Sequence, residues 1–299
     1  MKHSHEGAVP ASTEPVLSIT DLSIDFGGPT QAVSGVSLEL TPGRILGVAG
    51  QSGSGKSMTA LAAMGLVPPS AHVEGSIRFK GQELVGMTDR DRSRVRGSGM
   101  TMIFQETVTA LNPVVQIKKQ LMLAVTANVD CDADEARDRV EQSLRDVKLH
   151  DVDRVMNSYP YELSGGMCQR VMIAMALVCG ADVLFADEPT TALDVTVQRE
   201  VVDIIRGVAE DRNLAVMLIS HDIGVLEEVS DELAVMYQGR VVERGPSADV
   251  IAAPGHPYTA ALLNSIPRIS GGLTEFVEMP DFALDAVEHG EHDRTGSHA

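Results

Sequence analysis

The sequence predicts a mixed α/β fold with a helical insertion. Apolar runs of strand length, several of them followed by helix-forming segments, occupy residues 16–104 and 166–250. Between these stretches, residues 105–165 contain two segments with helical periodicity. A chain of 299 residues that is 43% hydrophobic is long enough to bury a substantial core. We therefore expect one α/β core in two sequence parts, with a helical subdomain at residues 105–165.

Strands dominate the first part of the expected core. Residues 16–26 alternate apolar and polar side chains, which is the period of a half-buried strand. Residues 45–49 are uninterruptedly apolar, as in a buried strand, and residues 58–66 follow as a helix former. Further strands are expected at residues 36–40, 76–79 and 100–104.

Helices come next, and strand–helix alternation then returns. Helices are expected at residues 115–127 and 134–147, and Asp132 with Glu135 resembles a capping box before the second. One face of that second helix carries the apolar residues Ala136, Val140, Leu144 and Val147. The remaining expected elements are helices at 164–179, 196–211 and 222–229 and strands at 183–186, 215–220 and 233–237.

Composition and charge argue against several classes of protein. The net charge of −18 disfavours a nucleic-acid partner, because phosphate backbones are bound by basic surfaces. No run approaches the ~18 apolar residues of a membrane span, and the first 15 residues lack the apolar centre of a signal peptide. Three cysteines without metal-ligand spacing favour a reducing compartment. We expect a cytosolic protein that reaches a membrane only through a partner.

The two ends of the chain have the composition of disordered segments. Residues 1–15 are expected to be disordered, as is the acidic tail at residues 273–299. Their histidines are expected to be solvated rather than to bind a metal.

One loop carries a phosphate-binding pattern. After the strand at 45–49, the motif G-x-x-x-x-G-K-[ST] is formed by Gly50, Gln51, Ser52, Gly53, Ser54, Gly55, Lys56 and Ser57, with Met58 opening the helix. Glycines permit close approach of the backbone, and the amides and the helix N-terminus attract phosphate. Lys56 is expected to neutralise the β- and γ-phosphates, and Ser57 to ligate Mg²⁺. The alternative, a plain Gly/Ser-rich turn, does not account for the strand–loop–helix context.

Two further segments fit the same chemistry. The strand at 183–186 ends in Asp187, which suits Mg²⁺, and Glu188, which is placed to polarise an attacking water; the alternative is a pair of solvated acids. Ser164, Gly165 and Gly166 precede a helix and offer a second anion site, or else only a helix cap. One nucleotide does not need two such sites in one chain unless they act in trans across a dimer.

The ordered motifs resemble the ATP-binding-cassette (ABC) ATPases over residues 16–267. They are the P-loop at 50–57, Gln105, the signature loop at 163–167, Asp187 with Glu188, the segment 192–194, and His221. The resemblance implies an ABC ATPase fold, with a P-loop NTPase (RecA-like) core, an N-terminal antiparallel β-subdomain and an inserted α-helical subdomain ending in the signature loop.

The resemblance also implies roles for single residues. Gln105 contacts Mg²⁺ or the attacking water, His221 contacts the γ-phosphate, and Asp194 couples two sites across a dimer. Phe26 matches the aromatic that stacks on adenine, although a core Phe in the first strand is the alternative. The expected cofactors are ATP and Mg²⁺. The implied catalytic residues are Glu188, His221 and Gln105, and the implied metal ligands are Ser57, Gln105 and Asp187.

Three segments that hydrolysis does not require are similar to those of oligopeptide, dipeptide and nickel importer ATPases. They are residues 104–113, 159–167 and 255–263, the last within an expected C-terminal extension at 251–272. This similarity implies two transmembrane permeases, an external substrate-binding protein and, from residues 111–114, a second and different cassette. Many relatives bind an iron–sulfur cluster through C-terminal cysteines, but none follows Cys179 here, so no cluster is expected.

The sequence departs from the importer pattern at two places and leaves other classes to compare. Cys168 replaces a basic or amide residue, and Glu106-Thr107 replaces Asp-Pro. A soluble ABC ATPase of translation or DNA maintenance would usually carry two cassettes or a long coiled coil, and a non-hydrolysing cassette would not need the intact acids. An exporter or an importer of chelated nickel are the alternatives within transport. The leading expectation is an importer ATPase, peripheral on the cytoplasmic face of the membrane, whose solute is a peptide or a related small molecule.

Overall fold

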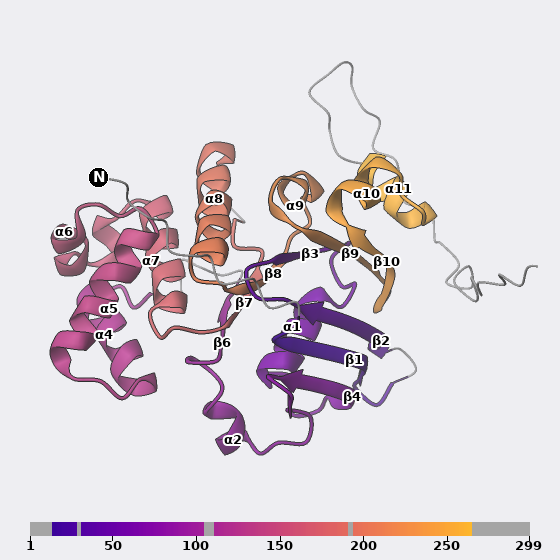
Figure 1. Ribbon diagram of the computed structural model, residues 1–299, viewed down its shortest axis with the longest axis horizontal. Coiled ribbons are helices and arrows are strands. Elements are labelled where there is room, and N and C mark those ends of the chain that lie inside the picture. The colour runs from indigo at the N-terminus through magenta and orange to yellow at the C-terminus, as the bar shows by residue number, and fades with distance from the viewer. Residues whose placement is uncertain (1–13, 29–30, 105–110, 191–193, 265–299) are drawn as a thin grey trace, which may run out of the picture.

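The computed structural model describes residues 14–28, 31–104, 111–190 and 194–264, which form two sheets and surrounding helices (Figure 1). The larger sheet has the spatial order β10 (Arg240–Pro246), β9 (Glu232–Tyr237), β3 (Ile45–Ala49), β8 (Ala215–Ile219), β7 (Val183–Asp187) and β6 (Met100–Ile103). The smaller sheet has the order β2 (Gln31–Leu40), β1 (Leu17–Asp25), β4 (His72–Phe79) and β5 (Gln82–Glu83).

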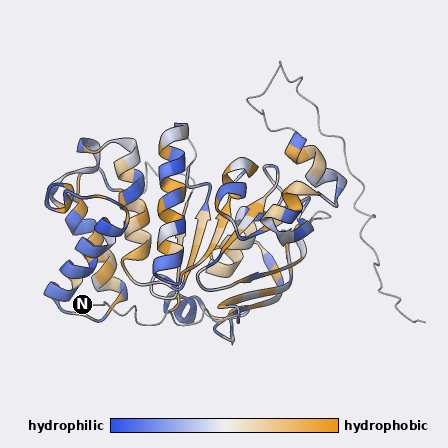
Figure 2. Ribbon diagram, turned by 45° about the horizontal axis from the view of Figure 1, so that its top comes forward, coloured by the Kyte–Doolittle hydropathy of each residue, from blue (hydrophilic) through white to orange (hydrophobic). Residues whose placement is uncertain are grey.

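The larger sheet is parallel except at one edge. β3 pairs in parallel with β8 and β9, β7 pairs in parallel with β6 and β8, and only β10 runs antiparallel to its neighbour. Every residue of β3, β7 and β8 is buried, as expected for parallel strands covered on both faces. Figure 2 shows these strands as a hydrophobic layer between helices with polar outer faces.

Alternate residues of the parallel strands enter two different hydrophobic cores. In β7, Val183 and Phe185 join the core shared with the antiparallel sheet and α1 (Lys56–Met64), whereas Leu184 and Ala186 join the core shared with the helices. This alternation follows from the period of two residues in a strand. The parallel sheet is therefore the common wall of both cores.

The helices of the second core include all five that the sequence predicts after residue 105. Along the chain they are α4 (Ile117–Asn128), α5 (Ala133–Asp146), α6 (Val152–Asn157), the 3-10 helix η1 (Pro160–Glu162), α7 (Gly165–Leu177), α8 (Val195–Asp211) and α9 (Ile223–Val229). The helices α10 (Ser247–Ala252) and α11 (Pro257–Asn264) end the described chain. The α/β core, the antiparallel N-terminal sheet and the inserted helices are thus confirmed. Of the described helices, none is both long and apolar enough to cross a bilayer.

Helix α5 shows how local sequence determines a helix and its buried face. The four apolar residues predicted for its inner face are all fully buried. Asp132 caps the helix by accepting hydrogen bonds from the amides of Asp134 and Glu135. The Glu135 carboxylate accepts a hydrogen bond from Arg139 one turn later, which differs from the reciprocal bond of a capping box.

The antiparallel sheet is larger than the sequence predicts. β2 begins at Gln31 rather than residue 36, and β4 begins at His72 rather than residue 76. The extra residues pair with the outer half of β1, where Ile24 faces Val33 on one side and Val73 on the other. Strand pairing, which a single segment does not reveal, sets these lengths. The short elements α2 (Asp89–Ser93), α6, α10, α11 and β10 were likewise not predicted.

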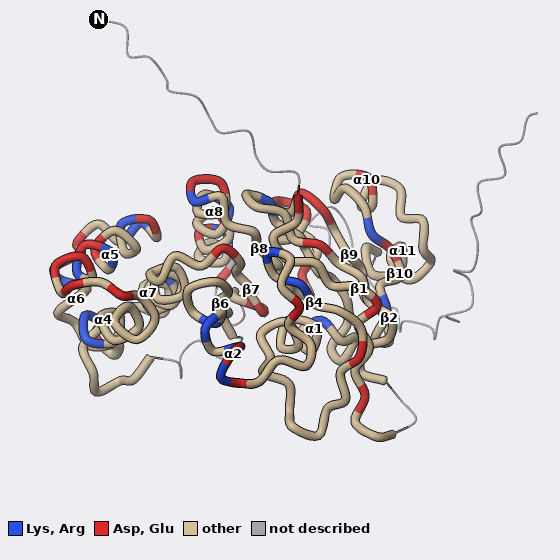
Figure 3. Tube along the Cα trace, turned by 60° about the horizontal axis from the view of Figure 1, so that its bottom comes forward, with Lys and Arg blue, Asp and Glu red and all other residues tan. Residues whose placement is uncertain are grey.

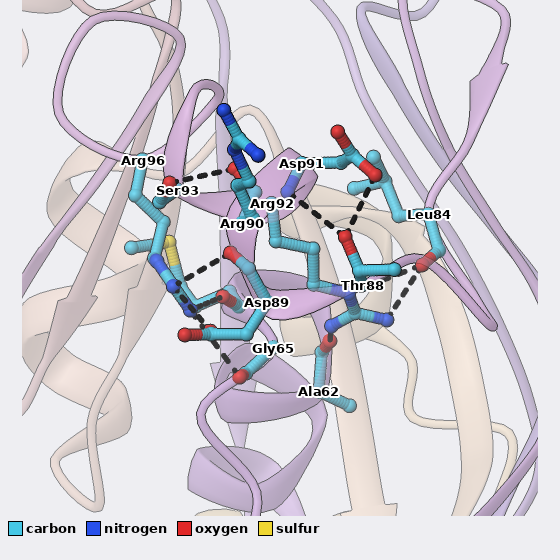
Figure 4. Close-up of polar contacts among 11 residues, drawn as sticks. Ala62, Gly65, Leu84, Thr88, Asp89, Arg90, Asp91, Arg92, Ser93 and Arg96 are labelled. Atoms are coloured by element: carbon cyan, nitrogen blue, oxygen red, sulfur yellow. Dashed lines mark hydrogen bonds and ion pairs between the residues drawn. The ribbon is translucent and has the colours of Figure 1, made fainter.

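Two arginines hold the C-terminal end of α1 (Figure 4). Arg92 donates to the carbonyl oxygens of Leu84 at 2.7 Å and Ala62 at 3.2 Å. Arg96 donates to the Gly65 carbonyl oxygen at 3.4 Å and pairs with Asp89 at 2.5 Å. Guanidinium groups add hydrogen bonds to carbonyl oxygens at a helix end and complement its negative dipole end. The helix that follows the P-loop is therefore fixed at its far end by Arg92 of α2 and by Arg96 shortly after it.

Candidate functional site

The P-loop connects β3 to α1, as the sequence predicts, and its glycines are required by space as well as by backbone angle. Gly50 has φ +148° and Gly55 has φ +100°. A Cβ at Gly50 would lie 2.2 Å from the Met236 carbonyl oxygen, and one at Gly55 would lie 2.7 Å from that of Ala32. The loop therefore packs against β9 and β2 at distances that only glycine permits.

The Lys56 ammonium is held by oxygen atoms of the loop itself. Its Nζ donates to the Gly50 carbonyl at 2.7 Å, the Gln51 carbonyl at 2.8 Å and the Ser54 hydroxyl at 3.4 Å. Burial lowers the pKa of Lys56, while the nearby charges of Glu188 and Asp187 act to raise it. The cation is thus enclosed in the loop that would receive phosphate.

Asp187 and Ser57 form a direct contact between two predicted site segments. The Ser57 hydroxyl, at the start of α1, donates to Asp187 Oδ1 at 2.9 Å, at the end of β7. Burial raises the pKa of Asp187, the hydrogen bond from Ser57 lowers it, and the Glu188 charge raises it. These two hard oxygens fit Mg²⁺, which typically takes few protein ligands and completes its octahedron with water and phosphate oxygens. Among the described residues, no group of three or more His, Cys, Asp or Glu that could hold a metal occurs.

Glu188 follows Asp187 in a strained backbone conformation. Its φ is +48°, which is uncommon for a residue with a side chain, and its amide donates to the Ile219 carbonyl at 3.0 Å. The Glu188 carboxylate lies 3.2 Å from Nδ1 of His221, whose side chain is 65% exposed. The neighbouring strands β7 and β8 thereby bring the predicted base and histidine together at their carboxyl ends.

The P-loop and Glu188 line one cavity of about 330 Å³. It is lined by Ala32, residues 52–58 and Glu188, so the predicted contact Met58 is part of it. Figure 3 shows acidic residues at the end of β7, and basic and acidic residues interspersed around α2, α5 and α8. A triphosphate in this cavity would meet loop amides, one ammonium group and a carboxylate.

The signature-loop residues line a different cavity of about 570 Å³. Ser164 caps α7 by accepting the Met167 amide at 3.3 Å, and Gly165 and Gly166 form its first turn. Asp194 lines the same cavity and caps α8, accepting the amides of Thr196 and Val197. This cavity and the P-loop cavity share no lining residue. The P-loop residues and the signature-loop residues therefore line two separate cavities of one chain.

Not every predicted contact lines one of these two cavities. Phe26 follows β1 with 43% of its surface exposed and lines neither of them. Gln105 lies outside the described residues, as do residues 191–193 before Asp194 and the acidic tail at 273–299. Cys168 is half-buried, its thiol contacts the Pro160 carbonyl at 3.3 Å, and burial raises its pKa, which disfavours the reactive thiolate.

Sequence reasoning missed Tyr258 as a residue of this site. The Tyr258 hydroxyl, on α11, accepts the backbone N–H of Gln51 in the P-loop at 3.0 Å. The two residues are 207 positions apart, so no local pattern joins them. The signal available was the Gly-His-Pro-Tyr-Thr segment at 255–259, which the chemistry of hydrolysis left unexplained.

Comparisons with known proteins agree with this geometry. A family model described as "ABC transporter" matches residues 33–191, and one described as "Oligopeptide/dipeptide transporter, C-terminal region" matches residues 242–290. The dipeptide transport ATP-binding protein DppD of Bacillus subtilis is 43% identical, over 86% of this chain and 78% of its own length. The oligopeptide transport ATP-binding protein OppD of Salmonella typhimurium is 39% identical, over 91% of this chain and 82% of its own.

A solved structure extends the agreement to three dimensions. The structure of cbiO1 from Clostridium perfringens, part of the ABC transporter complex cbiONQ, matches with a TM-score of 0.71 and 25% identity. The match covers 80% of this chain and 91% of that one. Sequence and fold therefore point to the same family.

Proposed function

This chain belongs to the ABC transporter family, and from that premise we propose that it is the ATP-hydrolysing subunit of an importer for oligopeptides or dipeptides. The peptide assignment draws on the C-terminal match at residues 242–290 and on relatives named for dipeptide and oligopeptide transport. Membrane permeases are its partners, because the relatives are ATP-binding subunits of transporters.

The observation that best supports hydrolysis is the 2.9 Å contact between Ser57 and Asp187. This contact joins the P-loop to the acid at the end of β7, so two of the three proposed Mg²⁺ ligands lie side by side. The third proposed ligand is Gln105. When bound, Mg²⁺ would polarise the phosphate oxygens of ATP and offset their charge. Lys56 would exchange the loop oxygens for the β- and γ-phosphates, and the loop amides would hold the same groups.

Glu188 would accept a proton from the water that attacks the γ-phosphate. Its carboxylate lies 3.2 Å from His221, which is exposed enough to contact the same phosphate. Hydrolysis then releases ADP and phosphate, with the proton of the water taken up at Glu188. Gln105 would report the state of the nucleotide to the permease, and Phe26 would stack on adenine.

A dimer of cassettes accounts for the second cavity. If two cassettes face each other, the P-loop of one and the residues Ser164, Gly165 and Gly166 of the other would enclose one ATP, with Asp194 linking the two sites. The separation of the two cavities within this chain supports that arrangement. We propose that the second cassette is a different protein, that both sit at the cytoplasmic face, and that an external binding protein delivers the solute. Because no cysteine follows Cys179, we propose that the chain binds no iron–sulfur cluster. Because the chain is acidic, we propose that it has no nucleic-acid partner.

Glu188→Gln provides the test. This variant should bind ATP and hold the dimer closed, so a pull-down from detergent-solubilised membranes with ATP and Mg²⁺ should recover two permeases and a second cassette. The genes next to those that encode the recovered subunits would then show whether the solute is a peptide or a chelated metal. Recovery of ribosomes or DNA-maintenance factors without membrane proteins would refute the transport assignment, and near-wild-type turnover would refute Glu188 as the base.

Lys56→Ala is the matched test of nucleotide binding. It should abolish binding of ATP while leaving the fold intact, because the Lys56 ammonium donates its hydrogen bonds to oxygen atoms of the P-loop itself. Retained tight binding would contradict the proposed phosphate site.

A further inference from the structure

The C-terminal helix α11 touches the P-loop through one buried side chain. Tyr258 is fully buried, and its hydroxyl oxygen accepts the Gln51 N–H at 3.0 Å. Its ring packs on that of Tyr237, at the end of β9, with centroids 4.3 Å apart. Burial raises the pKa of Tyr258, so its hydroxyl is neutral at physiological pH. This hydrogen bond thus joins α11 to Gln51, the first variable position of the P-loop.

This hydrogen bond acts on the same peptide unit that holds Lys56. The Gly50 carbonyl accepts the Lys56 ammonium at 2.7 Å, and the N–H of that peptide, which belongs to Gln51, is the group bound by Tyr258. Because a peptide unit is planar, fixing its N–H also fixes the direction of its carbonyl. The tyrosine hydroxyl therefore orients the carbonyl oxygen that accepts the Lys56 ammonium.

Tyr258 is itself held in place by a series of hydrogen bonds that begins at Glu243 in β10. The Glu243 carboxylate accepts the amides of Gly255 at 2.7 Å and His256 at 3.1 Å. Nδ1 of His256, which is 8% exposed, accepts the Tyr258 amide at 3.1 Å. These hydrogen bonds fix the start of α11 against β10, the edge strand of the larger sheet. The position of the hydroxyl thus depends on residues 243–258 as a unit.

We propose that Tyr258 is a positioning residue that sets the nucleotide affinity of the P-loop through the Gly50–Gln51 peptide. The inference rests on the proposed function, since it concerns the loop that would bind ATP. Without the hydroxyl, the Gln51 amide loses its partner and the loop visits orientations that do not bind phosphate. Apparent affinity falls in proportion to the fraction of competent loop, so Tyr258→Phe should weaken ADP binding by about threefold to tenfold. The maximal rate of hydrolysis should change less than about twofold, because saturating ATP restores the competent loop.

The experiment compares Tyr258→Phe with Thr259→Val in the full-length chain. Thr259 is the next residue of α11, it is fully buried, and its hydroxyl has no hydrogen-bond partner within the described part of the chain. Both variants remove one buried hydroxyl from one helix, but only the first removes a contact with the P-loop. Affinity is measured by titration with a fluorescent N-methylanthraniloyl ADP, and ATP turnover is measured as a function of ATP concentration.

We expect weaker ADP binding and a raised KM with a near-constant kcat for Tyr258→Phe, and wild-type values for Thr259→Val. Equal affinities for wild type and Tyr258→Phe, or an equal loss in both variants, would overturn the inference while leaving the proposed function intact. Failure of the wild-type chain itself to bind the fluorescent ADP would overturn the proposed function.

A measurement on the unmodified chain covers the case in which Tyr258→Phe does not fold. Amide hydrogen exchange, resolved by NMR without nucleotide, should show the Gln51 N–H protected relative to those of Ser52 and Gly53, for which no hydrogen bond from the amide is recorded among the described residues. Exchange of Gln51 at the rate of those neighbours would show that the hydroxyl does not hold the peptide, and would overturn the inference.

Discussion

Replacing Glu83 by Gln removes a carboxylate that organises the turn between β4 and β5. One carboxylate oxygen accepts the backbone N–H groups of Ile77, Leu84 and Val85 at 2.9 to 3.1 Å. The other accepts the Ser76 hydroxyl and lies 3.5 Å from the Arg78 guanidinium. A glutamine can present only one oxygen to these donors, so some of them must lose their partner.

The pKa of Glu83 gives the size of the effect. Burial raises this pKa, but the hydrogen bonds from Ser76, Ile77, Val85 and Arg78 lower it more, from 4.5 to about 2. The lowering from 4.5 to about 2 corresponds to about 3 kcal/mol of stabilisation of the charged form. Because the side chain is 39% exposed, solvent screening reduces this to about 1–2 kcal/mol of folding stability.

The sign of the pH dependence follows from the lowered pKa in the folded state. The contribution of Glu83 is fully present above the unfolded value of 4.5 and is lost as the pH falls through about 2. The stability gap between wild type and Glu83→Gln should therefore be constant from pH 7 to about pH 5 and should shrink below pH 4.5.

Urea unfolding followed by far-ultraviolet circular dichroism measures this gap at pH 7, 5 and 4. Glu74→Gln is the matched control, because Glu74 lies exposed on β4, the strand that pairs with β5. We expect the control to change stability by less than about 0.5 kcal/mol. Equal effects of the two variants at pH 7, or a gap that widens toward acid, would refute the assignment of this stabilisation to the Glu83 carboxylate.

Three further predictions concern the core, the arginine contacts and the metal ligand. Phe185→Ala should cost about 3–5 kcal/mol in urea unfolding, because Phe185 is fully buried; a loss below about 1 kcal/mol would contradict its place in the core. Gly65→Ala should lower the thermal midpoint, since Gly65 has φ +66° and its new Cβ would lie 2.2 Å from Arg92 Nη1; an unchanged midpoint would contradict this packing. Asp187→Asn should retain the Ser57 contact and the fold but weaken Mg²⁺-dependent ATP binding by about tenfold or more, measured by titration with and without Mg²⁺. Equal Mg²⁺ dependence in the variant and wild type would exclude Asp187 as a ligand.

The sequence was most informative where a short segment determines its own structure. The apolar run at 45–49, the glycines of the P-loop and the capping residue Asp132 each act within a few residues, and the structure has a strand, a loop and a capped helix there. The apolar strand before Asp187 was predicted for the same reason. How the nucleotide-contacting residues act remains a prediction, and Gln105 lies outside the described residues.

The features that the sequence did not predict depend on distant partners. The first residues of β2 are strand because β1 pairs with them, and Arg92 reaches the carbonyl of Ala62, 30 positions earlier in the chain. The Tyr258 contact with the P-loop spans 207 positions. Such contacts depend on how the sheet is assembled, which hydrophobic periodicity does not encode.

The strand order of the larger sheet has a consequence for how this protein folds during its synthesis. β3 lies between β8 and β9, so Ile45 pairs with Val216 and Ala49 pairs with Val235. A ribosome adds ~5–20 residues per second, so roughly 10–40 s pass between the synthesis of β3 and that of β9, the later of its two partner strands. All five residues of β3 are apolar or glycine, and all are buried in the finished sheet. The nascent chain must therefore shield this segment, by transient contacts or a chaperone, until its last parallel strand has left the ribosome.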